Sequence, residues 1–357
     1  MEQASHRTWK VRPYRDGDEK LLPDLYKSAD DMPFDFRYWH WLFKANPAGN
    51  GYVWLAEDDG VLAGQYAIIP TRMHLQGKPI RCAQALAAMT HTDYRNQGIF
   101  TKVAQALFEA TGSGEVDLVY GFPNDQSRHG HLKHLDFFVL ENLTTWVRPL
   151  DIARVLNLKT GNQVISKPLG KSAQAVFNTF YPRHIRSDTD IRIESTSRFP
   201  KEVDNLFQSC APKFQNLIIR DYEYLKWRYE DHPTHSYRIF LGYRGDILQG
   251  YCVCGTAVRK SIEIGLIMDL FSDPNDKDMA TSLIERAVGY MTEQNMMLAA
   301  CILTSKSPFL RQLKSLGFIL PAKTFTYVIR NNSDKLDPST LRHVKDWHIT
   351  FGDADFV

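Results

Sequence analysis

The sequence predicts an α/β protein of the α+β type built from two similar copies, and three observations support this. The length of 357 residues suits two domains better than one. Residues 83–121 run in the order buried strand, polar loop, helix, second strand. An aromatic segment ending in proline occurs twice, once before Pro47 and once before Pro233. A match of this kind indicates an internal duplication.

The polar loop of the first copy predicts an anion site. Residues 83–90 are an apolar run expected to form a strand, and apolar residues recur at helical spacing from Ile99 onward. The first amides of such a helix have no internal partner and carry the positive end of its dipole. Gly98 allows close backbone approach, and Arg95 adds a guanidinium. Together these features are suited to a phosphate or pyrophosphate.

The elements that follow this helix complete a recognisable order. Residues 116–120 predict the next parallel strand, which ends in Gly-Phe-Pro-Asn. A helix is expected over 126–134, and another strand over 137–140.

The segment Arg95-Asn96-Gln97-Gly98-Ile99-Phe100 resembles the acyl-CoA pyrophosphate loop of the GNAT acetyltransferases, whose pattern is Arg/Gln-x-x-Gly-x-Gly/Ala. Phe100 departs from this pattern, because glycine or alanine is usual there. Asn124 matches the asparagine that often follows the fifth strand of these enzymes. Taken by itself, a single glycine after a strand is also compatible with an ordinary strand-to-helix turn.

The resemblance implies a fold and a cofactor. Each copy is expected to be a mixed, mostly antiparallel twisted sheet flanked by helices. The co-substrate would be acetyl-CoA or another acyl-CoA, with pantetheine paired to the strand before the loop. The implied cofactor-binding residues are Met89, Thr90, Arg95, Asn96, Gln97, Gly98, Ile99, Phe100 and Asn124.

The duplication sets the predicted domain boundaries. A first GNAT-like domain with the acyl-CoA site is expected over 1–150, and a second, degenerate one over 186–330. Residues 151–185 are interpreted as a linker that includes a helix. Residues 331–357 are interpreted as a tail containing a strand, whose acidic turn either faces the cleft and recognises an amine or is simply exposed.

The second copy lacks the anion loop. After the strand near 266–270 its sequence contains no glycine but three carboxylates. Carboxylates beside a helix N-terminus fill the site that a pyrophosphate would need. Asp273 or Asp276 is expected to cap the helix that begins near Asp278.

Three histidines are the candidate acids and bases of the first copy. The family commonly uses a tyrosine in the helix after Asn124 to protonate the departing thiolate. Counting forward from Asn124 places His131 at that position, and counting back from Asp136 places Leu132 there. Neither residue is a tyrosine. His131 is the preferred acid, His129 the second choice, and His91 a candidate base. The alternatives are a solvated helix face rich in histidine and a simple loop residue.

Composition describes an ordinary globular protein. The chain is 43% hydrophobic and 24% charged, with a net charge of +2, which argues against nucleic acid or an anionic membrane as a partner. The five cysteines are interpreted as buried thiols, so no metal is expected and a cytoplasmic location is the simplest prediction.

The sequence therefore predicts an acyl-CoA-dependent N-acyltransferase that acts on a primary amine, for example an amino sugar. An acyl carrier protein is a narrower alternative donor. A non-catalytic CoA-binding or scaffolding module is the alternative from another class. The acceptor and the oligomeric state are not determined by the sequence.

Overall fold

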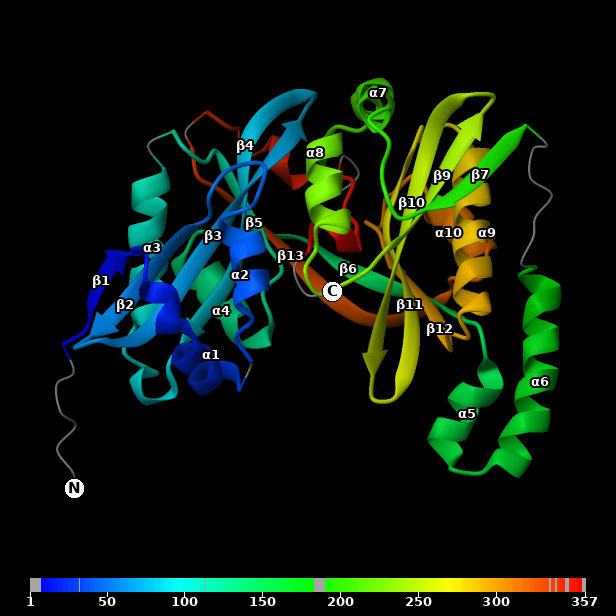
Figure 1. The fold of residues 1–357 in the computed structure, drawn as a ribbon, viewed down its shortest axis with the longest axis horizontal. Helices are drawn as coiled ribbons and strands as arrows, with labels where there is room; N and C mark the ends of the chain where they lie inside the picture. Colours follow the sequence, from blue (N-terminus) through cyan, green and yellow to red (C-terminus); the bar gives the residue numbers. More distant parts are fainter. Residues whose placement is uncertain are drawn as a thin grey trace. The chain divides into compact units, whose positions relative to one another are not determined.

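The computed structural model describes residues 8–31, 33–112, 114–182, 190–333, 335–337, 339–343 and 347–354 (Figure 1). The chain forms two compact units, each discontinuous in sequence. Unit 1 consists of Met1–Met73, Lys78–Asn142 and Thr326–Arg342, and unit 2 of His74–Gly77, Leu143–Phe325 and His343–Val357.

Unit 1 contains a sheet and four helices. Its strands are β1 (Lys10–Pro13), β2 (Tyr52–Asp58), β3 (Val61–Leu75), β4 (Lys78–Thr90), β5 (Leu118–Gly121) and the end of β13 (Leu320–Asn331). Its helices are α1 (Leu22–Asp30), α2 (Phe36–Phe43), α3 (Ile99–Thr111) and α4 (Asp125–His134), with short turns η1 (Asp18–Lys20), η2 (Thr92–Tyr94) and η5 (Thr340–Arg342).

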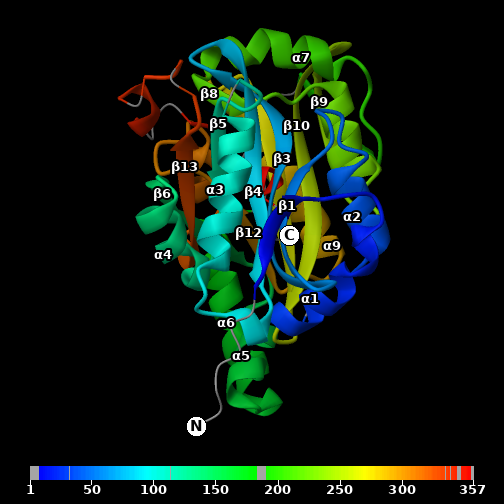
Figure 2. The ribbon, with the colours of Figure 1, turned by 90° about the vertical axis from the view of Figure 1, so that its left-hand side faces the viewer.

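The strands of unit 1 lie in the order β1-β2-β3-β4-β5-β13. The pair β4 and β5 is parallel, from Cys82 opposite Leu118 to Ala85 opposite Gly121, and β13 runs antiparallel to β5. Helices α1 and α2 lie on one side of this sheet, and α3 and α4 on the other (Figure 2). The apolar face of α3, including Val103 and Leu107, is fully buried against the sheet and forms the core.

Unit 2 repeats this plan. Its strands are β6 (Phe138–Pro149), β7 (Ile191–Thr196), β8 (Asn216–Ile218), β9 (Arg238–Arg244), β10 (Ile247–Arg259), β11 (Ile262–Ser272) and β12 (Leu298–Ile302). Its helices are α5 (Ile152–Thr160), α6 (Gln163–Phe180), α7 (Val203–Cys210), α8 (Tyr222–Leu225), α9 (Lys277–Glu293) and α10 (Leu310–Ser315), with turns η3 (Ala211–Lys213), η4 (Lys226–Glu230, π-helical) and η7 (Phe351–Asp353).

In unit 2 the strands run in the order β6-β12-β11-β10-β9-β7. The pair β11 and β12 is parallel, from Ile264 opposite Leu298 to Ile267 opposite Cys301, and α9 connects the two strands. This is the arrangement of β4, α3 and β5 in unit 1.

The last strand in the sheet of each unit follows, in sequence, the helices of the other unit. β6 follows α4 in sequence, yet its residues 145–149 pair with β12 of unit 2. β13 follows α10, yet its residues 328–331 pair with β5 of unit 1. The units are discontinuous for this reason, and no single cut in the sequence separates them.

Two local predictions differ from the structure. Residues 152–160 form helix α5 in addition to the helix expected in the linker. The strand expected in the tail is absent from the described residues 347–354: Trp347 makes one bridge to Asn216, and Phe351–Asp353 form a turn. The reason is that Asp353 folds back to accept from the Thr350 amide, which produces a turn rather than an extended segment.

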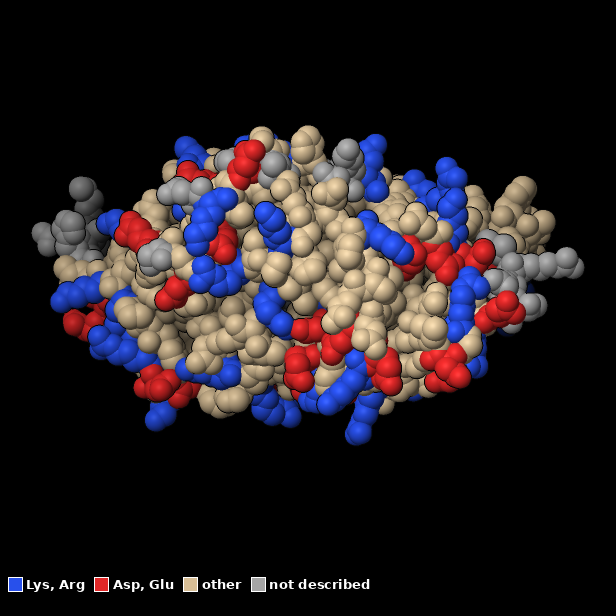
Figure 3. Space-filling model, turned by 90° about the horizontal axis from the view of Figure 1, so that it is seen from above, with Lys and Arg blue, Asp and Glu red and all other residues tan. Residues whose placement is uncertain are grey.

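Among the described residues, no helix is both long and apolar enough to cross a bilayer. All five cysteines are buried free thiols, as predicted. The face shown in Figure 3 carries positive and negative side chains interspersed, which agrees with the small net charge.

Candidate functional site

Helix α3 begins without a cap. Gly98 precedes the helix in the left-handed conformation, with φ of 77°, which a residue with a side chain adopts only with strain. Among the described residues, no side chain accepts a hydrogen bond from the first amides of α3, and the first turn of this helix contains no Asp or Glu. These N–H groups therefore keep their capacity to bind an anion, and the helix dipole favours one.

The loop before α3 is held in place from outside. Ser28, near the end of α1, accepts from the Thr92 amide at 3.1 Å, and the Thr92 hydroxyl donates to the Ser28 carbonyl. Arg95 donates from Nη2 to the Ala29 carbonyl at 2.7 Å, which positions its otherwise exposed guanidinium. The end of α1 thus orders the loop, a contribution that the sequence pattern did not reveal.

Strand β4 carries a conformational irregularity beside this loop. Ala87 has φ of 48°, an unusual value for a non-glycine residue inside a strand. The buried Gln65 of β3 donates from Nε2 to the Ala87 carbonyl at 3.1 Å. Pairing of β4 with β5 ends at Ala85 opposite Gly121, so residues 86–90 extend beyond it. Backbone strain of this kind is often stored at functional sites.

A pocket of about 490 Å³ lies at this place in unit 1. That volume is in the range of small-molecule sites. Its lining residues are Ala29, Ala88, Met89, Thr90, Tyr94, Arg95, Asn96, Gly98, Ile99, Phe100, Asn124, Gln126, Ser127 and Gly130. This lining includes an arginine and an uncapped helix start but no carboxylate, so it favours an anionic ligand.

The pocket brings together every predicted cofactor-binding residue except Gln97. The Gln97 side chain instead accepts from the Trp9 indole at 3.2 Å. Asn124 lines the pocket and also caps α4, where its Oδ1 accepts from the Ser127 amide at 2.9 Å. Ala88, Gly130 and Ser127 line the pocket without having been predicted, because no short motif contains them.

Gly130 explains how the loop accommodates Phe100. A side chain at position 130 would come within 2.5 Å of the Phe100 ring, so only glycine leaves room for it. The ring also packs edge-on against Tyr66 and His131, with centroids 5.6 and 5.2 Å away. The departure at Phe100 is thus matched by a glycine on the next helix.

None of the three predicted catalytic histidines lines the pocket. His131 is buried, donates from Nδ1 to the Ser127 carbonyl at 2.8 Å and faces the Tyr66 hydroxyl at 2.9 Å through Nε2. The carbonyl can only accept, so the neutral ring carries its proton on Nδ1 and accepts from Tyr66. Burial lowers the pKa of His131, because desolvation opposes the charged form.

The other two histidines have different settings. His129 is exposed, with its ring 6.3 Å from that of His134. His91 caps the short turn η2, and its Nδ1 accepts from the Asp93 amide at 3.2 Å. In the structure His91 therefore orders the loop.

The counterpart in unit 2 is closed. Asp276 caps α9 by accepting from the Met279 amide at 3.0 Å, and Arg244 pairs with the same carboxylate at 3.2 Å. Asp273 accepts from the Asn275 amide at 2.9 Å and pairs with Lys213. The predicted cap is confirmed, and it occupies the position that an anion would need.

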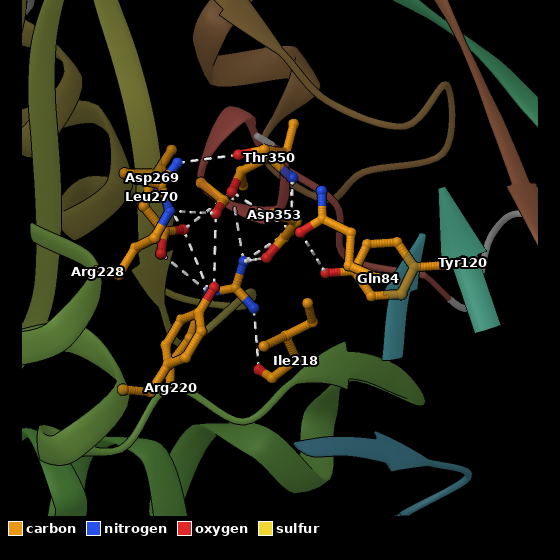
Figure 4. A network of polar contacts seen from close by, with 12 residues as sticks. Gln84, Tyr120, Ile218, Arg220, Arg228, Asp269, Leu270, Thr350 and Asp353 are labelled. Atoms are coloured by element: carbon orange, nitrogen blue, oxygen red, sulfur yellow. Dashed lines mark hydrogen bonds and ion pairs between the residues drawn. The ribbon is translucent and has the colours of Figure 1, made fainter. Parts of the chain in front are cut away.

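Unit 2 also contains a fully buried charged network (Figure 4). Arg220 lies between Asp269, at 3.0 Å, and Asp353, at 2.9 Å. Arg228 donates to the backbone carbonyls of Gly352 and Ala354 at 3.0 and 2.9 Å. These contacts attach residues 350–354 to β11, through Asp269, and to η4, through Arg228. The acidic turn of the tail is thus used internally at Asp353, while Asp355 lies outside the described residues.

The family description "Acetyltransferase (GNAT) domain" matches residues 10–132, which contain the loop, α3 and most of the pocket lining. This segment is therefore similar in sequence to a GNAT acetyltransferase domain. No curated protein sequence matches the chain.

Solved structures share the fold of the whole chain. A GCN5-related N-acetyltransferase from Anabaena variabilis is 12% identical, with a TM-score of 0.63 over 91% of this chain and 73% of its own. The N-myristoyltransferase of Saccharomyces cerevisiae, solved with bound myristoyl-CoA, is 12% identical, with a TM-score of 0.62 over 95% and 88%. The predicted fold class, tandem GNAT-like domains with mixed, mostly antiparallel sheets, is confirmed.

Proposed function

We propose that unit 1 binds an acyl-CoA in the pocket at the start of α3 and transfers its acyl group, most simply acetyl, to a primary amine. The observation that carries the proposal is the uncapped helix start behind Gly98, in a pocket that contains Arg95 and no carboxylate. Phosphate groups are among the anions that such amides bind, and a diphosphate presents two of them.

The residues of the pocket divide into two roles. The amides from Gly98 onward and the guanidinium of Arg95 hold the diphosphate. The backbone of residues 86–90, released from β5, offers hydrogen bonds to the pantetheine arm, as the resemblance implies. The positive φ at Ala87, whose carbonyl accepts a hydrogen bond from Gln65, sets the direction in which these backbone groups point. Proximity then does most of the work, because a fixed thioester reacts with a bound amine in an effectively unimolecular step.

Acyl-CoA supplies an activated thioester carbonyl when it is bound. The amine must attack as the free base, so it loses a proton to water or to a side chain of the acceptor site, and the thiolate gains one. An amino sugar or related metabolite is the proposed acceptor class. An acyl carrier protein remains a narrower choice of donor, since it presents the same pantetheine arm.

A non-catalytic CoA-binding module is the second candidate. The observation that favours it is that no His, Lys, Asp or Glu lines the pocket in the described part of unit 1. In that case unit 1 would bind CoA and unit 2 would act as a scaffold.

Ligand-induced thermal stabilisation tests the binding step. Acetyl-CoA at about a hundred times its dissociation constant should stabilise the wild type by about 2.7 kcal/mol. Arg95→Ala should lose most of this stabilisation, whereas the matched control Arg259→Ala, an exposed residue of unit 2, should retain it. A wild type that does not respond to acetyl-CoA would contradict the proposal.

Thiol release separates an enzyme from a binding module. The wild type is mixed with acetyl-CoA and a panel of amino sugars, other amines and peptides. Amine-dependent release of free CoA that Arg95→Ala lacks supports the transferase. Stabilisation by acetyl-CoA without release for any amine supports the binding module.

A further inference from the structure

Helices α5 and α6 of unit 2 form a hairpin that extends away from the sheet of their own unit (Figure 1). The two helices pack closely on each other: a side chain at Gly170 of α6 would come within 2.3 Å of the Ala153 Cα in α5. The base of the hairpin is anchored, because Arg154 donates to the Asn295 carbonyl at 2.5 Å and pairs with Glu263.

The hairpin tip, which we define as residues 158–167, exposes large apolar side chains. Val164 is 84% exposed, Ile165 53% and Leu158 46%. The apolar surface continues along α6 at Leu169, Val176 and Phe180. Isolated apolar side chains on a surface need no explanation, but several highly exposed ones within ten residues at the end of a projecting element indicate a binding surface.

The charge of the hairpin has a single sign. Residues 152–182 contain no Asp or Glu, whereas they contain Arg154, Lys159, Lys167 and Lys171. The three lysines are exposed, and none of them pairs with a carboxylate in the described residues. The net charge of the whole chain conceals this local excess, because it averages the hairpin with the mixed remainder.

Several polar groups of the tip form hydrogen bonds within the turn or with the residue just before it. The Gly161 amide donates to the Asn157 carbonyl at 2.8 Å, and Asn162 Oδ1 accepts from the Val164 amide at 3.0 Å. The hydroxyls of Thr160 and Ser166 bond to each other at 2.7 Å. A turn that satisfies its own backbone and hydroxyl groups loses little when it leaves water.

We propose that the α5–α6 hairpin docks unit 2 on the surface of an anionic lipid bilayer, with Leu158, Val164 and Ile165 inserted among the headgroups and the lysines facing the lipid phosphates. Apolar side chains flanked by lysine are the pattern of interfacial membrane anchors. A second copy of this chain is a poorer occupant, because two hairpins of the same charge repel each other. The proposal departs from the expectation drawn from net charge, and it does not depend on CoA binding.

Vesicle co-sedimentation of the full chain tests this. The wild type should bind vesicles of phosphatidylcholine mixed with phosphatidylglycerol, bind phosphatidylcholine alone far less, and detach at high salt. The double variant Val164→Glu/Ile165→Glu should lose binding. The variant Lys159→Glu/Lys167→Glu should weaken it on the order of tenfold or more, because each basic residue contributes about 1 kcal/mol near such a surface.

The matched control carries the same chemical change elsewhere in unit 2. Ile247→Glu/Val258→Glu replaces side chains that are 66% and 73% exposed and should bind vesicles like the wild type. Unchanged melting temperatures confirm that all variants fold. The proposal is overturned if the wild type does not prefer anionic vesicles, or if the control loses binding as the tip variants do. It is also overturned if light scattering shows a dimer that Val164→Glu/Ile165→Glu converts to a monomer.

Discussion

The starts of α3 and α9 occupy equivalent places in the two units. Helix α3 connects the parallel strands β4 and β5, and helix α9 connects the parallel strands β11 and β12. At α3 the residue before the helix is a left-handed glycine with no cap, and the neighbouring space is a pocket. At α9 the residue is Asp276, whose carboxylate caps the helix and pairs with Arg244. The same backbone frame is thus open to an anion in one copy and satisfied internally in the other.

This difference teaches that a duplicated fold does not duplicate a site. The frame depends on burial of α3 and α9 against their sheets, which both units achieve. The site depends on one or two residues at the helix start. Exchange of those residues leaves packing intact and changes only what the first amides bind.

The largest expected effect comes from placing a carboxylate at the start of α3. Gly98→Glu places a carboxylate at the anion site of unit 1 and strains a left-handed position. Acetyl-CoA binding should weaken more than about a hundredfold, which calorimetric titration can measure. Gly245→Glu is the control, since Gly245 also has positive φ and open space but lies in unit 2. Equal loss in both variants would show that the loss comes from general destabilisation and not from a carboxylate at the anion site.

Unit 2 contains a buried histidine, His348, whose protonation in acid should destabilise the protein. His348 of unit 2 packs against Phe214 and Phe309, and burial holds its pKa at about 3. As pH falls below 6.5 the unfolded chain takes up the proton first, so stability decreases between pH 6.5 and pH 3. Between pH 7 and pH 5 the protonation of His348 in the unfolded chain should lower the free energy of unfolding by about 2 kcal/mol.

The free energy of unfolding of His348→Phe should therefore fall by about 2 kcal/mol less than that of the wild type between pH 7 and pH 5, as measured by urea unfolding at each pH. The exposed His40→Phe serves as the control and should follow the wild type. If both variants show the wild-type slope, His348 is not the group that titrates.

A smaller effect is expected from removing the hydrogen bond that Gln65 donates to the Ala87 carbonyl in unit 1. Gln65→Leu removes the donor to the Ala87 carbonyl while it keeps the volume of a buried side chain. If Gln65 is a positioning residue, kcat should fall about tenfold while the stability changes little. Gln312→Leu, a buried glutamine in α10 of unit 2, should leave kcat unchanged. A fall in melting temperature that accounts for the lost activity would reduce Gln65 to a structural role.

The smallest effect is expected from removing the Asp276 cap at the start of α9. Asp276→Ala removes the cap of α9 and its pairing with Arg244, and should destabilise the protein by about 1 kcal/mol in urea. Asp276→Asn keeps a capping oxygen and should lose less. Neither variant should acquire a response to CoA, because the Asp273 carboxylate remains beside the start of α9. A new response would show that the cap alone closed the site.

The sequence was sufficient for features that depend on a few neighbouring residues. The loop with Gly98 before α3, the aspartate cap of α9 and the repeated strand-helix-strand order all follow from local backbone preferences and side-chain periodicity. These same features contain the predicted diphosphate loop. They could therefore be inferred before any contact between distant segments was known.

Only the tertiary structure decided how distant segments complete the site. Gln65 and Ala87, or Phe100 and Gly130, lie far apart in sequence, and no local pattern predicts that they meet. The burial of His131 and the exchange of β6 and β13 between the units have the same origin. Local conformational energies are encoded within a turn or two of chain, whereas burial and strand pairing depend on which surfaces meet once the whole chain has folded.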